Sequence, residues 1–104
     1  MQVQVHTDSS VNGSDNLSHA VETAVEGAVK RWTQRITRVE VHLSDLNRAK
    51  GGADDKRCLM EARLGGLQPI AVSHLAGTLP EAIDGAADKL KKSLESTLGK
   101  LNDR

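Results

Sequence analysis

Several residue types that mark large protein classes are scarce in this chain of 104 residues. One cysteine, Cys58, excludes a disulfide framework and favours a reducing, cytoplasmic setting. Tyr and Phe are missing and Trp32 is the single aromatic residue, which argues against the base-stacking surfaces of many RNA-binding domains. No run approaches the roughly 18 apolar residues of a membrane-spanning helix, and no basic segment precedes an apolar one at the N-terminus. We therefore expect neither a membrane partner nor a signal peptide.

Neither sign of charge is in excess, because 14 basic and 14 acidic side chains give a formal net charge of +0. A polycation that coats nucleic acid through its bulk charge is therefore excluded. The charges are nevertheless unevenly spread. Residues 1–29 hold four acidic residues and no Lys or Arg, whereas residues 30–63 hold nine basic residues against five acidic ones. Such polarity suits docking on a large polyanion in one orientation, and a merely solvated surface explains it about equally well.

Hydropathy patterns predict six elements of secondary structure. Alternation indicates half-buried strands, as at Val39 and Val41, whereas apolar residues three and four apart, such as Val21 and Val25, indicate a helix that buries one face. The predicted elements are a strand at residues 1–6, a helix at 15–32, strands at 37–45, 56–64 and 67–77, and a helix at 79–101. A loop is predicted at residues 46–55 and a hairpin turn at Gly65 and Gly66.

The order strand, helix, strand, strand, strand, helix predicts an α+β fold. A helix that connects two strands makes them parallel, and the later strands follow as a meander. We therefore predict one domain over residues 1–104, of order β-α-β-β-β-α, in which a four-stranded mixed sheet carries both helices on one face. Trp32 is expected to be buried between the first helix and the sheet. The residues predicted to face water from the other side of the sheet are Gln2, Gln4, His6, Arg38, Glu40, His42, Arg57, Leu59, Glu61 and Arg63.

The last predicted helix begins with a capping box, Thr78 to Glu81, and sorts its charges by flank. Its buried stripe is predicted to contain Leu79, Ile83, Ala86, Ala87, Leu90, Leu94, Thr97 and Leu101. On a helical wheel the acidic residues Glu81, Asp84, Asp88 and Glu95 fall on one side of this stripe, and the basic residues Lys89, Lys92 and Lys100 fall on the other. A second basic group spans the end of the first helix and the turn after it and consists of Lys30, Arg31, Arg35 and Arg38.

No motif for catalysis is found, so we expect no enzyme activity, catalytic residue, cofactor or small-molecule substrate. His6 and His42 could be neighbours on adjacent strands, but a third and a fourth zinc ligand are missing from the pattern, and no metal site is predicted. Cys58 is expected in the core without a base to activate it. His74 is expected to be a hydrogen-bonded residue at a strand end rather than a catalyst.

Two stretches of the sequence resemble a known family. ITRVEVHLSD at residues 36–45 and AIDGAADKL at residues 82–90, together with the order of elements over roughly residues 1–101, are similar to the family of ribosome hibernation-promoting factors and ribosome-associated inhibitors, also described as sigma-54 modulation or S30EA-like proteins. The resemblance implies a fold like that of double-stranded-RNA-binding domains. It also implies a short-form, divergent member, without the additional C-terminal domain of the long members.

The resemblance further implies binding to the small ribosomal subunit under stress or in stationary phase. Members lie at the decoding region of the 16S rRNA, in the channel for messenger RNA and tRNA, and block translation by occupancy. By position, Lys89, Lys92 and Lys100 match basic positions of the family's last helix, and Arg35 matches the arginine before the second strand. The RNA-binding residues expected on this basis are Lys30, Arg31, Arg35, Arg38, Lys89, Lys92 and Lys100.

Two functions from different classes stay open. The first is a cytoplasmic, ribosome-binding translation inhibitor that is monomeric off the ribosome. The second is a hibernation-factor fold reused as a protein-interaction module with eroded RNA contacts. Clustered lysines favour the first, whereas Ser96, Leu98 and Asn102 favour the second, because they stand where the family's last helix commonly continues with lysines.

Overall fold

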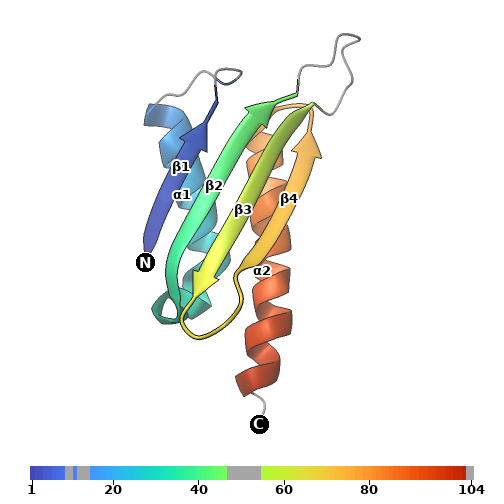
Figure 1. Ribbon diagram of the computed structural model, residues 1–104. Helices are drawn as coiled ribbons and strands as arrows, with labels where there is room; N and C mark the ends of the chain where they lie inside the picture. The colour runs from blue at the N-terminus through green and yellow to red at the C-terminus, as the bar shows by residue number, and fades with distance from the viewer. Residues whose placement is uncertain (9–10, 12–14, 47–54, 103–104) are drawn as a thin grey trace.

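The computed structural model describes residues 1–8, 11, 15–46 and 55–102, with side chains as far as residue 99. The elements follow the predicted order (Figure 1). They are β1 (Gln2–Thr7), α1 (Asp15–Val29), the short 3-10 helix η1 (Lys30–Arg35), β2 (Ile36–Asp45), β3 (Lys56–Leu64), β4 (Ile70–Ala76) and α2 (Leu79–Asn102). The predicted loop lies mostly outside the described residues, at 47–54.

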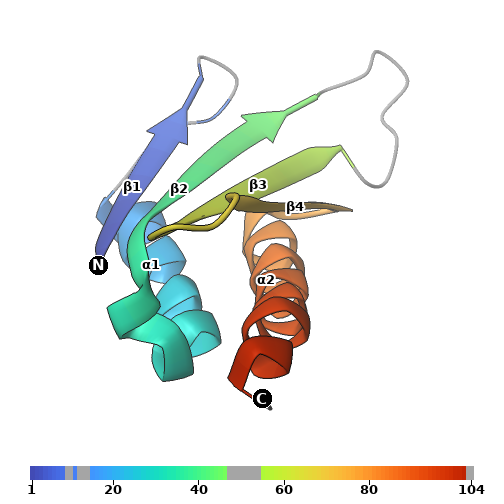
Figure 2. The same cartoon turned by 60° about the horizontal axis from the view of Figure 1, so that its bottom comes forward.

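The sheet has the predicted mixed topology, in the order β1-β2-β3-β4. β1 pairs with β2 in parallel, because α1 carries the chain back across the sheet, and the other two pairs are antiparallel. Both helices cover the same face of the sheet, as Figure 2 shows. The predicted α+β fold is therefore confirmed. The likeness to double-stranded-RNA-binding domains stays a prediction.

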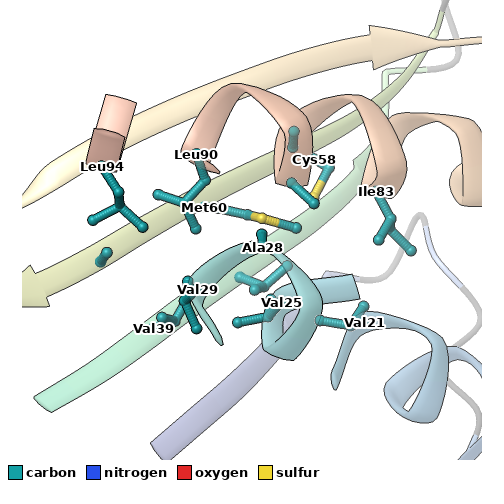
Figure 3. Close-up of a cluster of buried hydrophobic side chains, with 14 of the residues drawn as sticks. Val21, Val25, Ala28, Val29, Val39, Cys58, Met60, Ile83, Leu90 and Leu94 are labelled. Carbon is teal, nitrogen blue, oxygen red and sulfur yellow. The ribbon is translucent and has the colours of Figure 1, made fainter. Parts of the chain in front are cut away.

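One hydrophobic core lies between the sheet and the two helices (Figure 3). Val25 of α1, Leu90 of α2 and Met60 of β3 are each 0% exposed and approach one another from three elements. Trp32 is 4% exposed, so its predicted burial is confirmed. On the opposite face of the sheet the strands present the predicted polar side chains, all of them exposed or half-buried. None of the described helices has the length and apolarity needed to cross a membrane.

α1 ends at Val29, three residues before the predicted end at Trp32. The Thr33 hydroxyl donates to the carbonyl oxygens of Lys30, at 3.1 Å, and of Val29, at 3.5 Å. Such local side-chain bonds compete with the continuation of an α-helix. Trp32 accordingly leaves the helical region, at φ −124° and ψ 19°, and its indole turns into the core. The chain tightens here into η1, which leads directly into β2.

β4 begins at Ile70, later than the predicted start at residue 67. Pro69 stands just before it and has no N–H to donate to a sheet. The predicted turn at Gly65 and Gly66 is confirmed, and Gly66 has a φ of 78°, in the left-handed region that glycine adopts without strain.

α2 begins with the predicted cap and differs from prediction near its end. Thr78 accepts a hydrogen bond from the Glu81 backbone N–H at 3.3 Å, and its hydroxyl donates to the Glu81 carboxylate at 2.9 Å. The predicted burial of Thr97 is wrong, since Thr97 is exposed, and Leu98 is 0% exposed instead. Leu98 continues the i, i+4 row of Leu90 and Leu94 along the core side of the helix. Leu98 is therefore a core residue and not a lost RNA contact.

Candidate nucleic-acid interface

The sheet topology brings most of the candidate cations to one end of the molecule. η1, the start of β2, the end of β3 and the C-terminal half of α2 all lie at the same end (Figure 1). By element, the candidate residues fall into three groups. They are Lys30, Arg31 and Arg35 on η1; Arg38 on the open face of the sheet; and Lys89, Lys92 and Lys100 on α2.

The η1 cations are exposed, and no ion pair to a described carboxylate involves Lys30, Arg31 or Arg35. Buried Trp32 anchors the turn, so that its neighbours point outward. The Arg31 guanidinium lies over the indole of Trp32, 5.1 Å from the ring centroid, and this contact orients the cation without neutralising it. The residues of η1, Lys30 to Arg35, line a hollow. Three uncompensated positive charges around a concave surface suit a phosphate group.

Arg38 is held in a network of ion pairs on the open face. Its Nη2 lies 3.0 Å from Glu40 Oε2, and Arg63 Nε donates to the same oxygen at 3.2 Å. Arg63 also pairs with Glu61, at 3.0 Å. Burial works to raise the pKa of Glu40, but the hydrogen bonds and charges of Arg63 and Arg38 outweigh it and hold this pKa below its usual value. The charge of Arg38 is therefore largely compensated within the protein.

The strand patterns predict Arg63 and Glu40 on the open face but do not predict the network of ion pairs that joins them. The network depends on the β2–β3 register, which sets Arg38 opposite Arg63 and Glu40 opposite Glu61. Like charges directly opposite each other are unfavourable. The diagonal pair of Arg63 with Glu40 and the same-strand pairs of Arg38 with Glu40 and of Arg63 with Glu61 relieve this. An alternating strand pattern does not reveal register, so no signal in the sequence identifies these partners.

Two of the candidate α2 lysines, Lys89 and Lys92, have described side chains, and their surroundings differ. Lys89 Nζ donates to the Ser73 carbonyl oxygen of β4 at 2.9 Å, which ties α2 to the edge strand and leaves the charge uncompensated. Lys92 Nζ lies 3.1 Å from Asp88 Oδ2 in an exposed i, i+4 pair. The charge of Lys92 is therefore compensated by an acidic residue of the same helix. The side chain of Lys100 lies outside the described residues.

Cys58 does not have the surroundings of a reactive thiol. Its side chain is 0% exposed, and burial raises its pKa to about 12. The thiol is therefore protonated at neutral pH, and a protonated thiol is a poor nucleophile. This agrees with the core position predicted from the strand pattern.

Comparison with known proteins gives one family and several structures of the same fold. The family model described as "Sigma 54 modulation protein / S30EA ribosomal protein" matches residues 3–102. The chain is similar to a ribosomal subunit interface protein from Coxiella burnetii, at 15% identity and a TM-score of 0.78, over 95% of this chain and 99% of that one. It is also similar to the N-terminal domain of Protein Y from Thermus thermophilus, at 20% identity and a TM-score of 0.76, over 93% and 99%. No curated protein matches the chain.

Proposed function

Because the chain belongs to the sigma 54 modulation protein / S30EA ribosomal protein family, we propose that it is a translation inhibitor that binds the small ribosomal subunit. It occupies the channel for messenger RNA and tRNA at the decoding region of the 16S rRNA, under stress or in stationary phase. It acts in the cytoplasm as a single domain that is monomeric off the ribosome. Inhibition is by occupancy and involves no covalent chemistry.

Three uncompensated cations on η1 carry this proposal. Lys30, Arg31 and Arg35 are exposed, have no described carboxylate partner in an ion pair, and surround a hollow. Ribosomal RNA presents a dense array of phosphates, and cations that replace its counterions gain affinity by releasing them. A neutral protein can bind such a surface if its free positive charges lie together and its acidic groups are compensated or distant.

We rank the other proposed RNA contacts behind the η1 cations, because each of them already has a partner within the protein or lacks a described side chain. Lys89 keeps its charge but must leave the Ser73 carbonyl oxygen or bind phosphate beside it. Lys92 and Arg38 must exchange Asp88 and Glu40, respectively, for phosphate. The full set of proposed RNA contacts is Lys30, Arg31, Arg35, Arg38, Lys89, Lys92 and Lys100.

A protein-interaction module is the second candidate function. The observation in its favour is that the cations of the open face, Arg38 and Arg63, are paired with the carboxylates of Glu40 and Glu61. A surface with internally compensated charge binds polyanions weakly. If this candidate is right, ribosomal subunits will not bind the protein even at low salt.

Sedimentation with purified ribosomal subunits tests the proposed function. The protein should sediment with small subunits at about 50 mM salt and be largely released at about 200 mM, because each phosphate contact adds to the salt dependence. Large subunits under the same conditions are the matched control and should carry little protein. Small subunits already loaded with messenger RNA and tRNA should exclude the protein. Absent or salt-independent binding would contradict the proposal, and equal binding to loaded subunits would place the contact outside the channel.

A further inference from the structure

The imidazoles of His6 and His42 stack on the open face of the sheet. β1 and β2 are parallel and pair these two residues in register, so both side chains emerge on the same side. Their ring centroids are 4.6 Å apart and the planes are inclined by 15°. Two imidazoles are thereby held side by side on neighbouring strands, on a surface that water reaches, since both residues are exposed.

Glu40 supplies a third donor atom beside them. It precedes His42 by two positions on β2 and therefore shares its face of the sheet. Glu40 Oε1 lies 3.5 Å from His6 Nε2. One ligand atom from each of the three residues lies within 4.8 Å of the others. In a tetrahedral zinc site, with bonds of about 2.1 Å, the donor atoms are roughly 3.4 Å apart. The three donor atoms are close to this spacing, but at least one imidazole must rotate out of the near-parallel stack so that both rings point a nitrogen at the same ion.

Two imidazoles, a carboxylate and one open position form a donor set that Zn²⁺ favours. We propose that His6, Glu40 and His42 form a binding site for a divalent transition-metal cation, with Zn²⁺ as the ion that fits best and water as the fourth ligand. A hard cation such as Mg²⁺ is excluded as the preferred ion, because it takes oxygen ligands in octahedral geometry. The sequence pattern contains His6 and His42 as possible neighbours, and the third ligand emerges only from their register with Glu40.

The two arginines beside Glu40 prepare its carboxylate for this role. Arg38 and Arg63 both contact Oε2, at 3.0 and 3.2 Å, which leaves Oε1 facing His6. Hydrogen bonds to a ligating carboxylate fix its orientation. The same guanidinium groups repel a cation, so we expect weaker binding than at a zinc site without them.

The site is separate from the proposed RNA-binding turn, η1. Neither histidine belongs to the proposed RNA contacts, and His6 and His42 project from the open face of the sheet. Metal binding by the free protein is therefore measurable without ribosomes. Its failure would leave the proposed function untouched.

Titration of the untagged full chain with Zn²⁺ tests the proposal by calorimetry. One ion should bind per chain, and Zn²⁺ should raise the melting temperature, because a ligand that binds only the folded state stabilises it. His6→Gln and His42→Gln should each weaken binding at least about tenfold, since even the loss of an indirect partner of a metal ligand costs about 10- to 100-fold. Co²⁺ should show the visible absorption of a four-coordinate site, without the charge-transfer band of a thiolate, because Cys58 is buried.

His19→Gln is the matched control, because His19 is an exposed histidine on α1, away from the sheet face. It should bind Zn²⁺ like the wild-type chain. Glu40→Gln provides a second route to the same conclusion if a histidine variant folds poorly, and it should also weaken binding. Wild-type protein that does not bind Zn²⁺, His6→Gln protein that binds with wild-type affinity, or an equal loss in His19→Gln would each overturn the proposal.

Discussion

The imidazole of His74 packs against the backbone of Gly85. His74 lies on the helix-facing side of β4, and α2 crosses over it so closely that a Cβ atom at position 85 would overlap the ring. Glycine is therefore required at this position by the approach of another element and not by its own backbone conformation. This gives a physical reason for the glycine near the start of α2, within one of the two stretches that resemble the family.

Gly85→Ala should destabilise the protein by about 1–2 kcal/mol in the free energy of unfolding. Overpacking a filled interface costs about 1–3 kcal/mol, and this outweighs the roughly 0.5–1 kcal/mol that alanine normally gains over glycine inside a helix. Urea denaturation measures the difference. Gly99→Ala, in the same helix with nothing within 4 Å of its added Cβ, should instead be stabilising. In a His74→Ala background Gly85→Ala should lose its penalty, and an unchanged penalty would contradict the proposed contact.

Leu98→Ala should cost about 2–5 kcal/mol, the usual range for a fully buried leucine. The loss follows from its burial at 0% exposure on the core side of α2. The neighbouring Thr97→Ala should change the free energy of unfolding by less than about 0.5 kcal/mol, because Thr97 is exposed. Thermal or chemical denaturation of both variants checks the assignment. Similar losses in the two variants would mean that the helix is rotated relative to the sheet.

The thiol of Cys58 should not react with iodoacetamide in the folded protein at pH 8. The side chain is 0% exposed, and a pKa of about 12 leaves about one thiol in 10⁴ ionised at that pH. Mass spectrometry should detect alkylation only after denaturant is added. Alkylation of the native protein at the rate of a small free thiol would contradict the burial.

Stability should fall at high pH through the same residue. The folded-state pKa of Cys58, about 12, lies above its ordinary value of 9.0, so between these values the unfolded chain releases a proton that the folded chain retains. The free energy of unfolding therefore decreases as the pH rises above 9, by up to about 1.4 kcal/mol per pH unit from this residue. Cys58→Ala should lack this component. Identical pH dependence of the two proteins between pH 9.5 and 10.5 would contradict the shift.

Alternation in the sequence predicted the strands well because one face of each is buried. β3 was predicted at residues 56–64 and runs over Lys56–Leu64. The end of α1 was predicted less well. No glycine or proline directly follows Val29 to mark the end of α1 in the sequence. The Thr33 hydroxyl helps to end the helix by donating hydrogen bonds to nearby backbone carbonyl oxygens. In α2 the predicted stripe included Thr97 and left out Leu98, whereas the packing against the sheet buries Leu98.

The candidate site was only partly predictable, for a different reason. The sequence identifies the candidate cations, but whether each one is free to bind RNA depends on which carboxylates lie beside it. Glu40 compensates Arg38 through the β2–β3 register, and Asp88 compensates Lys92 along α2. Lys30 has no such partner among the described residues. The distances between side chains on different strands depend on the tertiary structure, and an alternating sequence pattern does not predict them.

The most direct test of ribosome binding through η1 is the salt dependence of affinity for purified small subunits. We predict that the triple change Lys30→Gln, Arg31→Gln and Arg35→Gln weakens binding and lowers the slope of log affinity against log salt by about one unit per lost phosphate contact. The melting temperature should change little, since these side chains are exposed.

Two further variants complete this measurement. Replacing Lys89, Lys92 and Lys100 with Gln should weaken binding less, because Lys89 and Lys92 already have partners in the protein. Replacing Glu81, Asp88 and Glu95 with Gln is the control and should not weaken it. We predict the greatest loss of affinity and of slope for the η1 variant, and wild-type affinity and slope for that variant would contradict ribosome binding through η1.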